Sequence, residues 1–261
     1  LSLWILSMTR HQPLSFLNHH LKCGNSLVGT WLEEIGNYPF SRIKKEIRQL
    51  NLFEQDPDFR AAVEEVIAKN SLIAGKASAN LGDVREKKEW LEEIDHLLNG
   101  YKALCDVHAN LKIKNSSIDE VQYAQMLQNK DFTFARSLTP EKYFHWELEF
   151  PFLLWKNGFD SMVGNPPYVQ LQAMGDMADT LQGLDFETFA RTGDIYCLFY
   201  EQGVRLLREN GILGLITSNK WMRAGYGEAL RNFFAEKTNP SVLVDFSGQK
   251  IFESATVDVN I

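Results

Sequence analysis

The sequence contains one run of four residues that suits a specific chemistry, Asn165-Pro166-Pro167-Tyr168. An aromatic amine such as adenine N6 is a poor nucleophile, because its lone pair is delocalised into the ring; a site that accepts both amine hydrogens localises that pair. Asn165 offers a side-chain carbonyl for one hydrogen and Pro166 a backbone carbonyl for the other, while two prolines hold the backbone stiffly. Tyr168 offers a flat face to the ring, so the run predicts preorganised binding of a ring amine without covalent catalysis.

The same four residues are also common in ordinary turns, because asparagine and proline are favoured there. The apolar run FDSMVG (159–164) directly before Asn165, and the sheet pattern after it, favour the functional interpretation. A base inside a duplex cannot reach such a pocket, so it must be flipped out and stacked on aromatic side chains. This requires a second aromatic residue from elsewhere in the chain.

Strands and helices alternate around this motif, which is typical of an α/β fold with a parallel, doubly wound sheet. The expected elements, in order, are a strand at 159–165, a helix at 195–210 closed by Gly211, a buried strand at 211–218, a helix at 227–237 and strands at 241–247 and 256–261. Residues 171–194 form a polar, acidic stretch long enough to be a lid or binding loop. Residues 14–29 are expected to form an approach loop and a short strand that ends at Gly24-Asn25.

Ligands of such sheets bind beyond the carboxyl ends of the strands. Asn25, Asn165 and Ser218-Asn219 all follow expected strand ends. Lys220 and Arg223 come directly afterwards, where they either contact phosphates or are simply solvated. Asp194 is expected to cap the helix that follows it.

Residues 31–145 have a different sequence pattern, in which charged and apolar residues are interleaved at helical spacing. Leu91, Ile94, Leu97 and Leu98 share one helical face. We expect a helical hairpin or small bundle, whose charged residues form a solvated face.

The composition limits the possible functions. Of the 261 residues 44 % are hydrophobic and 23 % charged, which predicts a folded chain, and the net charge is −7. A domain that grips DNA usually carries a basic surface, so any DNA contact must use a local basic rim or another part of the protein. Three separated cysteines argue against a zinc ribbon or disulfide framework and suit the cytoplasm. The apolar start is too short to span a membrane.

These motifs resemble those of the gamma-class N6-adenine DNA methyltransferases, particularly enzymes of type II restriction–modification systems, some of which share one chain with a nuclease. The resemblance covers residues 1–30 and about 146–261, and it is most specific at GFDSMVGNPPY (158–168). It implies a partial Rossmann-like methyltransferase sheet from these two segments, interrupted by a large α-helical insertion at 31–145. It also implies S-adenosylmethionine as the methyl donor and a flipped adenine in DNA as the substrate.

The resemblance further assigns roles to individual residues. Asn165, Pro166, Pro167 and Tyr168 match the motif that holds the target amine beside the methyl donor. Asn25 matches a residue that contacts the adenine of S-adenosylmethionine; alternatively, it only forms a turn. Phe199 matches an aromatic residue that packs on the same adenine; alternatively, it is a core residue. Phe252 matches the aromatic that stacks on the flipped base.

The departures from this family are as informative. The glycine-rich cofactor turn is absent, and we expect it upstream of residue 1, with a target-recognition domain downstream. The 261 residues alone are therefore expected to be inactive. Two alternatives remain open, namely a protein-glutamine or RNA methyltransferase, which can use the same motif, and a non-catalytic DNA-interaction module of a restriction complex.

Overall fold

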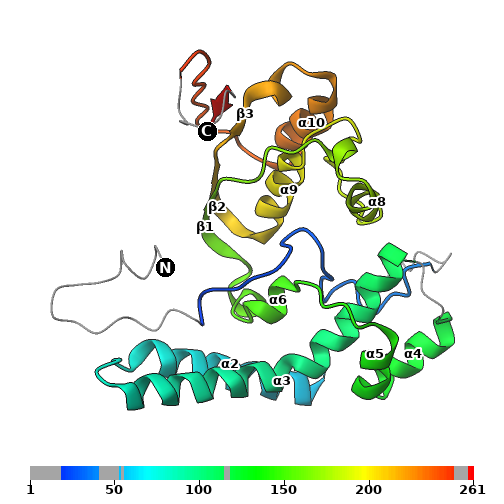
Figure 1. Ribbon diagram of the computed structural model, residues 1–261, viewed down its shortest axis with the longest axis vertical. Coiled ribbons are helices and arrows are strands. Elements are labelled where there is room, and N and C mark those ends of the chain that lie inside the picture. The colour runs from blue at the N-terminus through cyan, green and yellow to red at the C-terminus, as the bar shows by residue number, and fades with distance from the viewer. Residues whose placement is uncertain (1–18, 41–52, 54–55, 115–117, 250–257) are drawn as a thin grey trace. The chain divides into compact units, whose positions relative to one another are not determined.

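The computed structural model describes residues 19–40, 53, 56–114, 118–249 and 258–261 (Figure 1). The chain divides into two compact units, Leu1–Phe152 and Leu153–Ile261, which we call the helical unit and the sheet unit. Residues 19–30 lie in the helical unit. The predicted division, 1–30 with 146–261 against 31–145, stays a prediction, because compactness reflects contacts rather than family origin.

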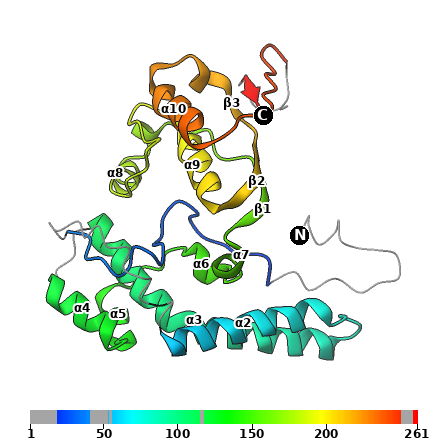
Figure 2. The same ribbon diagram turned by 180° about the vertical axis from the view of Figure 1, so that it is seen from behind.

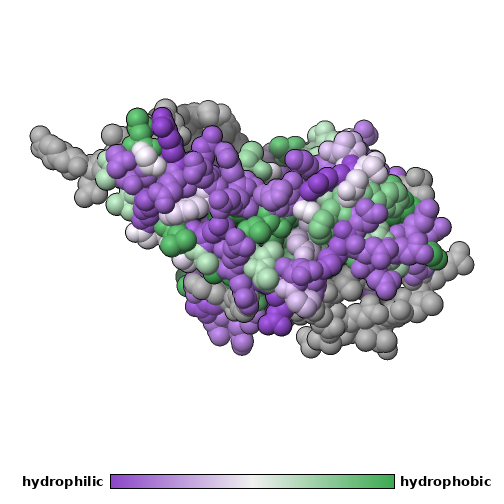
Figure 3. All heavy atoms as spheres, turned by 90° about the horizontal axis from the view of Figure 1, so that it is seen from below, coloured by the Kyte–Doolittle hydropathy of each residue, from purple (hydrophilic) through white to green (hydrophobic). Residues whose placement is uncertain are grey.

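Two antiparallel helices dominate the helical unit, α2 (Pro57–Gly75) and α3 (Leu81–Lys114) (Figures 1 and 2). Asp56 caps α2 by accepting a hydrogen bond from the backbone of Asp58, with proline at the first helical position. The apolar face predicted on α3 is confirmed, because Ile94 and Leu98 are buried. Hydrophilic side chains cover most of the face seen in Figure 3.

Among the described residues of this unit, three shorter helices follow, α4 (Glu120–Gln128), α5 (Phe132–Leu138) and α6 (Trp146–Glu149). A capping box starts α4, in which the Asp119 carboxylate accepts from the backbone of Gln122 and the Gln122 side chain from the backbone of Asp119. Asp131 caps α5 through the backbone N–H of Phe134. The starts of α4 and α5 are thus fixed by local side-chain caps, whereas α6 has none.

The two ends of the predicted insertion lie side by side. The backbone N–H of Phe144 donates to the carbonyl of Val28 at 3.1 Å, and the Trp146 indole donates to the carbonyl of Ser26 at 2.9 Å. Residues 19–40 form turns without a strand, so the strand predicted to end at Gly24-Asn25 is wrong over residues 19–25. Instead of pairing with a strand, these residues form local backbone turns, such as the bond from the Val28 N–H to the Asn25 carbonyl, and bond to the 144–147 segment.

A buried polar cluster joins this junction to α3. The backbone N–H of Thr30 donates to His145 Nδ1 at 3.0 Å, so Nε2 carries the proton and donates to Asp106 Oδ1, also at 3.0 Å. The Thr30 hydroxyl donates to the Cys105 carbonyl at 3.0 Å and lies 3.2 Å from His108 Nδ1. The residues before and after the predicted insertion are therefore tied to its longest helix.

The sheet unit begins with α7 (Leu153–Lys156) and contains two parallel strands, β1 (Phe159–Gly164) and β2 (Leu207–Leu215). Helix α9 (Tyr196–Leu206) packs on one face of this pair: a Cβ at Gly203 would lie 2.8 Å from Leu213. The side chains of Val163 and Ile212 are 88 % and 71 % exposed. The prediction of a buried strand at 211–218 is therefore wrong at Ile212, because within the described residues α9 covers the opposite face of the pair.

Two predicted boundaries differ in the structure. The helix expected to reach Asn210 ends at Leu206, and β2 starts immediately afterwards. Asn210, not Gly211, takes the left-handed conformation, with φ of 60°, which asparagine tolerates better than most residues. The predicted loop at 171–194 also contains secondary structure, η1 (Leu171–Ala173) and α8 (Asp176–Gln182).

Short elements follow β2. They are β3 (Thr217–Ser218), η2 (Asn219–Met222), η3 (Gly225–Gly227), α10 (Glu228–Lys237) and β4 (Val259–Asn260), which pairs antiparallel with β3. The strand predicted at 241–247 is reduced to a bridge between Asp245 and Asn260 and a few backbone hydrogen bonds. The described fold is thus mixed α/β with a small parallel sheet.

Candidate functional site

The NPPY motif lies at the carboxyl end of β1, as the sequence predicted. Asn165 directly follows the last residue of the strand and its side chain is exposed. Within the described residues this side chain has no hydrogen-bond partner, so its carbonyl is open to a ligand. Pro166 is buried and Pro167 exposed, so the first proline anchors the turn against the protein.

Tyr168 is fixed by contacts on two sides. Its hydroxyl donates to the carbonyl of Ile216 at 3.1 Å, and the ring meets Tyr196 edge-on, with centroids 6.2 Å apart. Burial raises the pKa of Tyr168, which keeps the hydroxyl protonated and able to donate. The ring position is therefore set by the protein before any ligand arrives.

The chain after the motif is tied to the start of α9. The backbone N–H of Ile195 donates to the carbonyl of Val169 at 2.9 Å, and that of Leu171 donates to Gly193 at 2.8 Å. Together with the link from Tyr168 to Ile216, these bonds hold the motif between α9 and the end of β2. The motif is thus a supported turn at a sheet edge.

Asp194 does not cap α9, contrary to the prediction, because Ile195 is the N-cap residue and has no side-chain capping bond. The buried carboxylate of Asp194 instead accepts from the hydroxyl of Tyr226 at 2.8 Å. That hydroxyl lies 2.9 Å from the hydroxyl of Tyr196, the ring that Tyr168 contacts. Burial raises the pKa of both Tyr196 and Tyr226, so both remain protonated and can donate.

The two residues predicted to meet the cofactor belong to different units. Asn25 belongs to the helical unit, is exposed, and accepts from the backbone N–H of Leu27 at 3.1 Å, which is turn-forming behaviour. Phe199 belongs to the sheet unit and packs against a core cluster that includes Tyr196 and Tyr200. The roles of Asn25 and Phe199 in cofactor binding therefore stay predictions.

Phe252, predicted to stack on the flipped base, lies outside the described residues. The chain on both sides of it is well ordered by pairing: Val244 and Ile261 exchange two backbone hydrogen bonds, of 2.7 and 2.9 Å. The backbone N–H of Gly248 donates to the Asp258 carboxylate at 3.0 Å. The described residues 244–249 and 258–261 thus form a paired stem.

Sequence reasoning missed a polar cluster at this stem. The side-chain amide of Asn219 donates to Asp245 at 3.0 Å and to the Ser247 hydroxyl at 2.7 Å. Asn219 stands at the predicted strand end, yet its partners are 26 and 28 residues away. No local pattern in the sequence marks them as partners.

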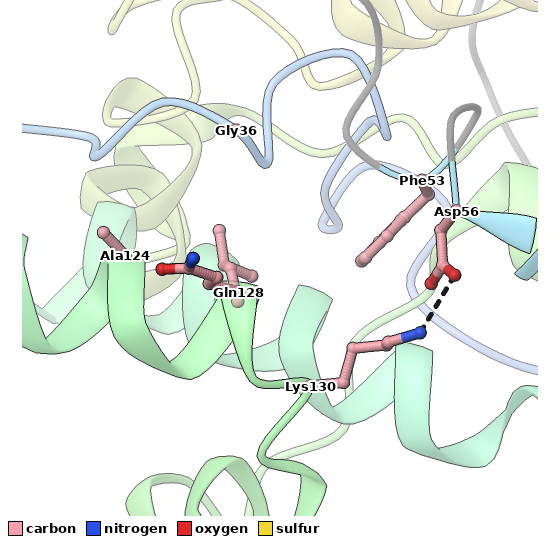
Figure 4. Close-up of a pocket in the computed structure, with 7 residues that line it drawn as sticks. Gly36, Phe53, Asp56, Ala124, Gln128 and Lys130 are labelled. Carbon is pink, nitrogen blue, oxygen red and sulfur yellow. Dashed lines mark hydrogen bonds and ion pairs between the residues drawn. The ribbon is translucent and has the colours of Figure 1, made fainter. Parts of the chain in front are cut away.

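A separate cavity of about 310 Å³ lies in the helical unit (Figure 4). It is lined by Gly36, Phe53, Asp56, Ala124, Leu127, Gln128 and Lys130. The Lys130 amine pairs with Asp56 at 2.9 Å and with Asp58 at 2.7 Å, so its charged groups satisfy one another. Its lining contains no residue of the NPPY motif.

The described residues contain no group of three or more His, Cys, Asp or Glu side chains that could hold a metal ion. Across the same parts of the chain, no helix combines the length and apolar character needed to traverse a bilayer.

Comparison with known proteins identifies the family. Residues 39–252, more than half of the chain, match the Eco57I restriction-modification methylase family. The chain belongs to this family.

Several curated relatives are similar to parts of the chain. The type II methyltransferase M.BstVI of Geobacillus stearothermophilus is 31 % identical over 42 % of this chain, and M.BanIII of Aneurinibacillus aneurinilyticus is 35 % identical over 38 %. The type II restriction enzyme and methyltransferase RM.Eco57I of Escherichia coli is 32 % identical over 41 %. The matches cover 20 %, 17 % and 11 % of these relatives' own lengths, respectively. No solved structure matches the chain.

Proposed function

We propose that the chain is part of a DNA methyltransferase of a restriction–modification system, which methylates the N6 amine of adenine. The observation that carries this proposal is the exposed Asn165 at the carboxyl end of a parallel strand, beside a Tyr168 ring held by the protein. Membership of the Eco57I family and similarity to type II methyltransferases support the same function. They do not favour a protein-glutamine or RNA methyltransferase.

In this proposal, the residues of the motif activate the amine by accepting hydrogen bonds, without covalent catalysis. The Asn165 carbonyl and the Pro166 backbone carbonyl each accept one amine hydrogen, which localises the nitrogen lone pair. Tyr168 stacks on the flipped adenine and Phe252 covers it from the other side. S-adenosylmethionine supplies the methyl group when bound, and Asn25 and Phe199 are the proposed contacts to its adenine.

The finer features of the protein are part of the proposal. We expect gamma-class motif order, a Rossmann-like sheet in the longer protein, and a cytoplasmic enzyme. A nuclease and a target-recognition domain in the same full-length chain are consistent with the name of RM.Eco57I.

The decisive variant is Asn165→Ala in the full-length protein. We expect methylation of DNA to fall below detection, because one acceptor of the amine hydrogens is lost, while the melting temperature stays unchanged because the side chain is exposed. The measurement is transfer of a labelled methyl group to a mixed-sequence plasmid. Retention of full activity would refute the assigned role.

Asn239→Ala is a matched control, because Asn239 is also an exposed asparagine that precedes a proline in the sheet unit. It should keep wild-type activity. Wild-type protein should also label DNA in preference to RNA and to glutamine-containing peptides, and the labelled base should be N6-methyladenine. Labelling of peptide or RNA alone would overturn the choice of substrate.

A further inference from the structure

The basic side chains of the sheet unit are mostly engaged within the protein. Arg208 pairs with Asp160 at 2.6 Å, Lys237 with Glu187 at 3.9 Å, and Arg191 with Asp179. The Arg231 guanidinium donates to two backbone carbonyls, of Trp221 at 2.6 Å and Ala224 at 3.1 Å. Arg205 also has an interaction partner.

Lys220 and Arg223 differ from all of these. Both are exposed, and neither has an ion pair or a side-chain hydrogen bond within the described part of the chain. They lie three positions apart, on and directly after η2. Two cations that form no ion pair within the described residues are notable in a chain whose net charge is −7.

Their position relates them to the candidate site. The backbone N–H of Ile216 donates to the carbonyl of Gly164 at 3.0 Å. Ile216 therefore lies beside Gly164, the residue before Asn165. An extended chain advances by about 3.3 Å per residue, so Asn219, which follows Ile216 by three residues, lies at most about 10 Å from it. Lys220 and Arg223 therefore follow the same carboxyl edge of the sheet as the NPPY motif.

The backbone that carries the two cations is rigid. Trp221 lies between them, is buried, and donates from its indole to Asn260 at 3.2 Å. Arg231 holds the carbonyls on both sides of Arg223, as described above. Because the backbone is fixed, the two charges are presented in a set arrangement, which reduces the entropy cost of binding an anion.

The acidic group that faces them is already occupied. Asp245 accepts from Asn219 and from the Ser247 hydroxyl and backbone, at distances of 2.8 to 3.1 Å. Arg223 contributes to lowering the pKa of Asp245, after the bonds from Asn219 and Ser247, but forms no ion pair with it in the described structure. Arg223 thus keeps donors available to an external oxyanion.

We propose that Lys220 and Arg223 form a phosphate-binding pair that contacts the DNA backbone beside the flipped adenine. The pair supplies the local basic rim that an acidic chain needs in order to bind a polyanion. This inference rests on the proposed function, because it takes DNA as the ligand.

The test uses Lys220→Gln/Arg223→Gln in the full-length protein and a mixed-sequence DNA duplex of about 30 base pairs. Each phosphate contact contributes about 0.9 to the slope of log K against log salt concentration. The double variant should therefore have a slope smaller by about 2. Between about 50 and about 200 mM salt, the wild type should lose roughly 12-fold more affinity than the variant.

The control is Arg208→Gln/Lys237→Gln, which removes the same charge from paired, exposed side chains of the same unit. Its slope should match the wild type. A slope unchanged in the Lys220/Arg223 variant, or lowered equally in both variants, would overturn the phosphate pair.

Methylation kinetics separate this inference from the proposed function. If wild-type protein does not methylate DNA, the proposed function fails. If it does, the double variant should raise KM for DNA with little change in kcat, because phosphate contacts bind substrate and transition state alike. A wild-type KM in that variant would overturn the phosphate pair alone.

Discussion

In the helical unit the best-connected polar side chains are buried: Thr30, Asp106 and His145 bond to one another inside the protein. In the sheet unit Asn165 is exposed and, within the described residues, has no hydrogen-bond partner. Polar groups that satisfy one another in the interior specify a fold, whereas polar groups held open on a rigid turn are available to a ligand. The contrast predicts that substitutions in the first region change stability and those in the second change activity.

The largest effect is expected for His145→Ala in the helical unit. The variant removes the imidazole N–H that donates to the Asp106 carboxylate, which keeps the backbone N–H of Tyr143 as a donor, and it leaves the Thr30 backbone N–H without its acceptor. Losing a hydrogen bond to a carboxylate and leaving a buried N–H unsatisfied together cost about 4 kcal/mol. Urea unfolding of the 261-residue chain measures the loss.

His96→Ala is the control for this variant, because His96 is an exposed histidine on α3. It should change the free energy of unfolding by less than about 0.5 kcal/mol. Equal stability losses in the two variants would mean that the buried cluster contributes nothing specific, and the comparison between the units would lose its basis.

A smaller effect is expected from pH, through His108. Burial first, and then the charge of Lys112, lower the pKa of His108 to about 4 in the folded chain, against its ordinary value of 6.5. The unfolded chain then binds the proton more readily between these values, so His108 contributes stability above pH 6.5 that is lost as the pH falls toward 4. The contribution is roughly 3 kcal/mol at most.

The measurement compares wild type with His108→Gln in urea at pH 7 and pH 4.5. The variant should lose roughly 2–3 kcal/mol less than the wild type over this interval, whatever its stability at pH 7. An identical pH dependence in the two proteins would show that His108 takes up its proton without unfolding.

Local signals in the sequence predicted the local parts of the structure. The apolar run before Asn165 and the two prolines after it marked where β1 ends, and the spacing of Ile94 and Leu98 marked the buried face of α3. Both depend on residues within a few positions of each other. That is why they could be read without knowing the tertiary contacts.

The remaining features depend on partners far apart in the sequence. Asp194 looked like a helix cap because the sequence does not reveal that Tyr226 lies against it. The sequence around Asn219 does not indicate its bond to Asp245. The apolar residues of β2 likewise do not indicate that Ile212, on one face of the strand, is exposed. These are tertiary arrangements, which residue type and spacing do not encode.

The smallest effect is expected for Ile212→Ala on β2, and a neighbour on the same strand makes it informative. Ile212 is 71 % exposed, so little apolar surface is lost and the cost should be below about 0.5 kcal/mol in the 261-residue chain. Leu213 packs on α9 and the core cluster, so Leu213→Ala should cost about 2 kcal/mol. Because parallel strands are usually covered on both faces, equal costs would mean that the face carrying Ile212 is covered in solution. A large difference would instead establish that α9 alone stabilises the strand pair on which the NPPY turn is built.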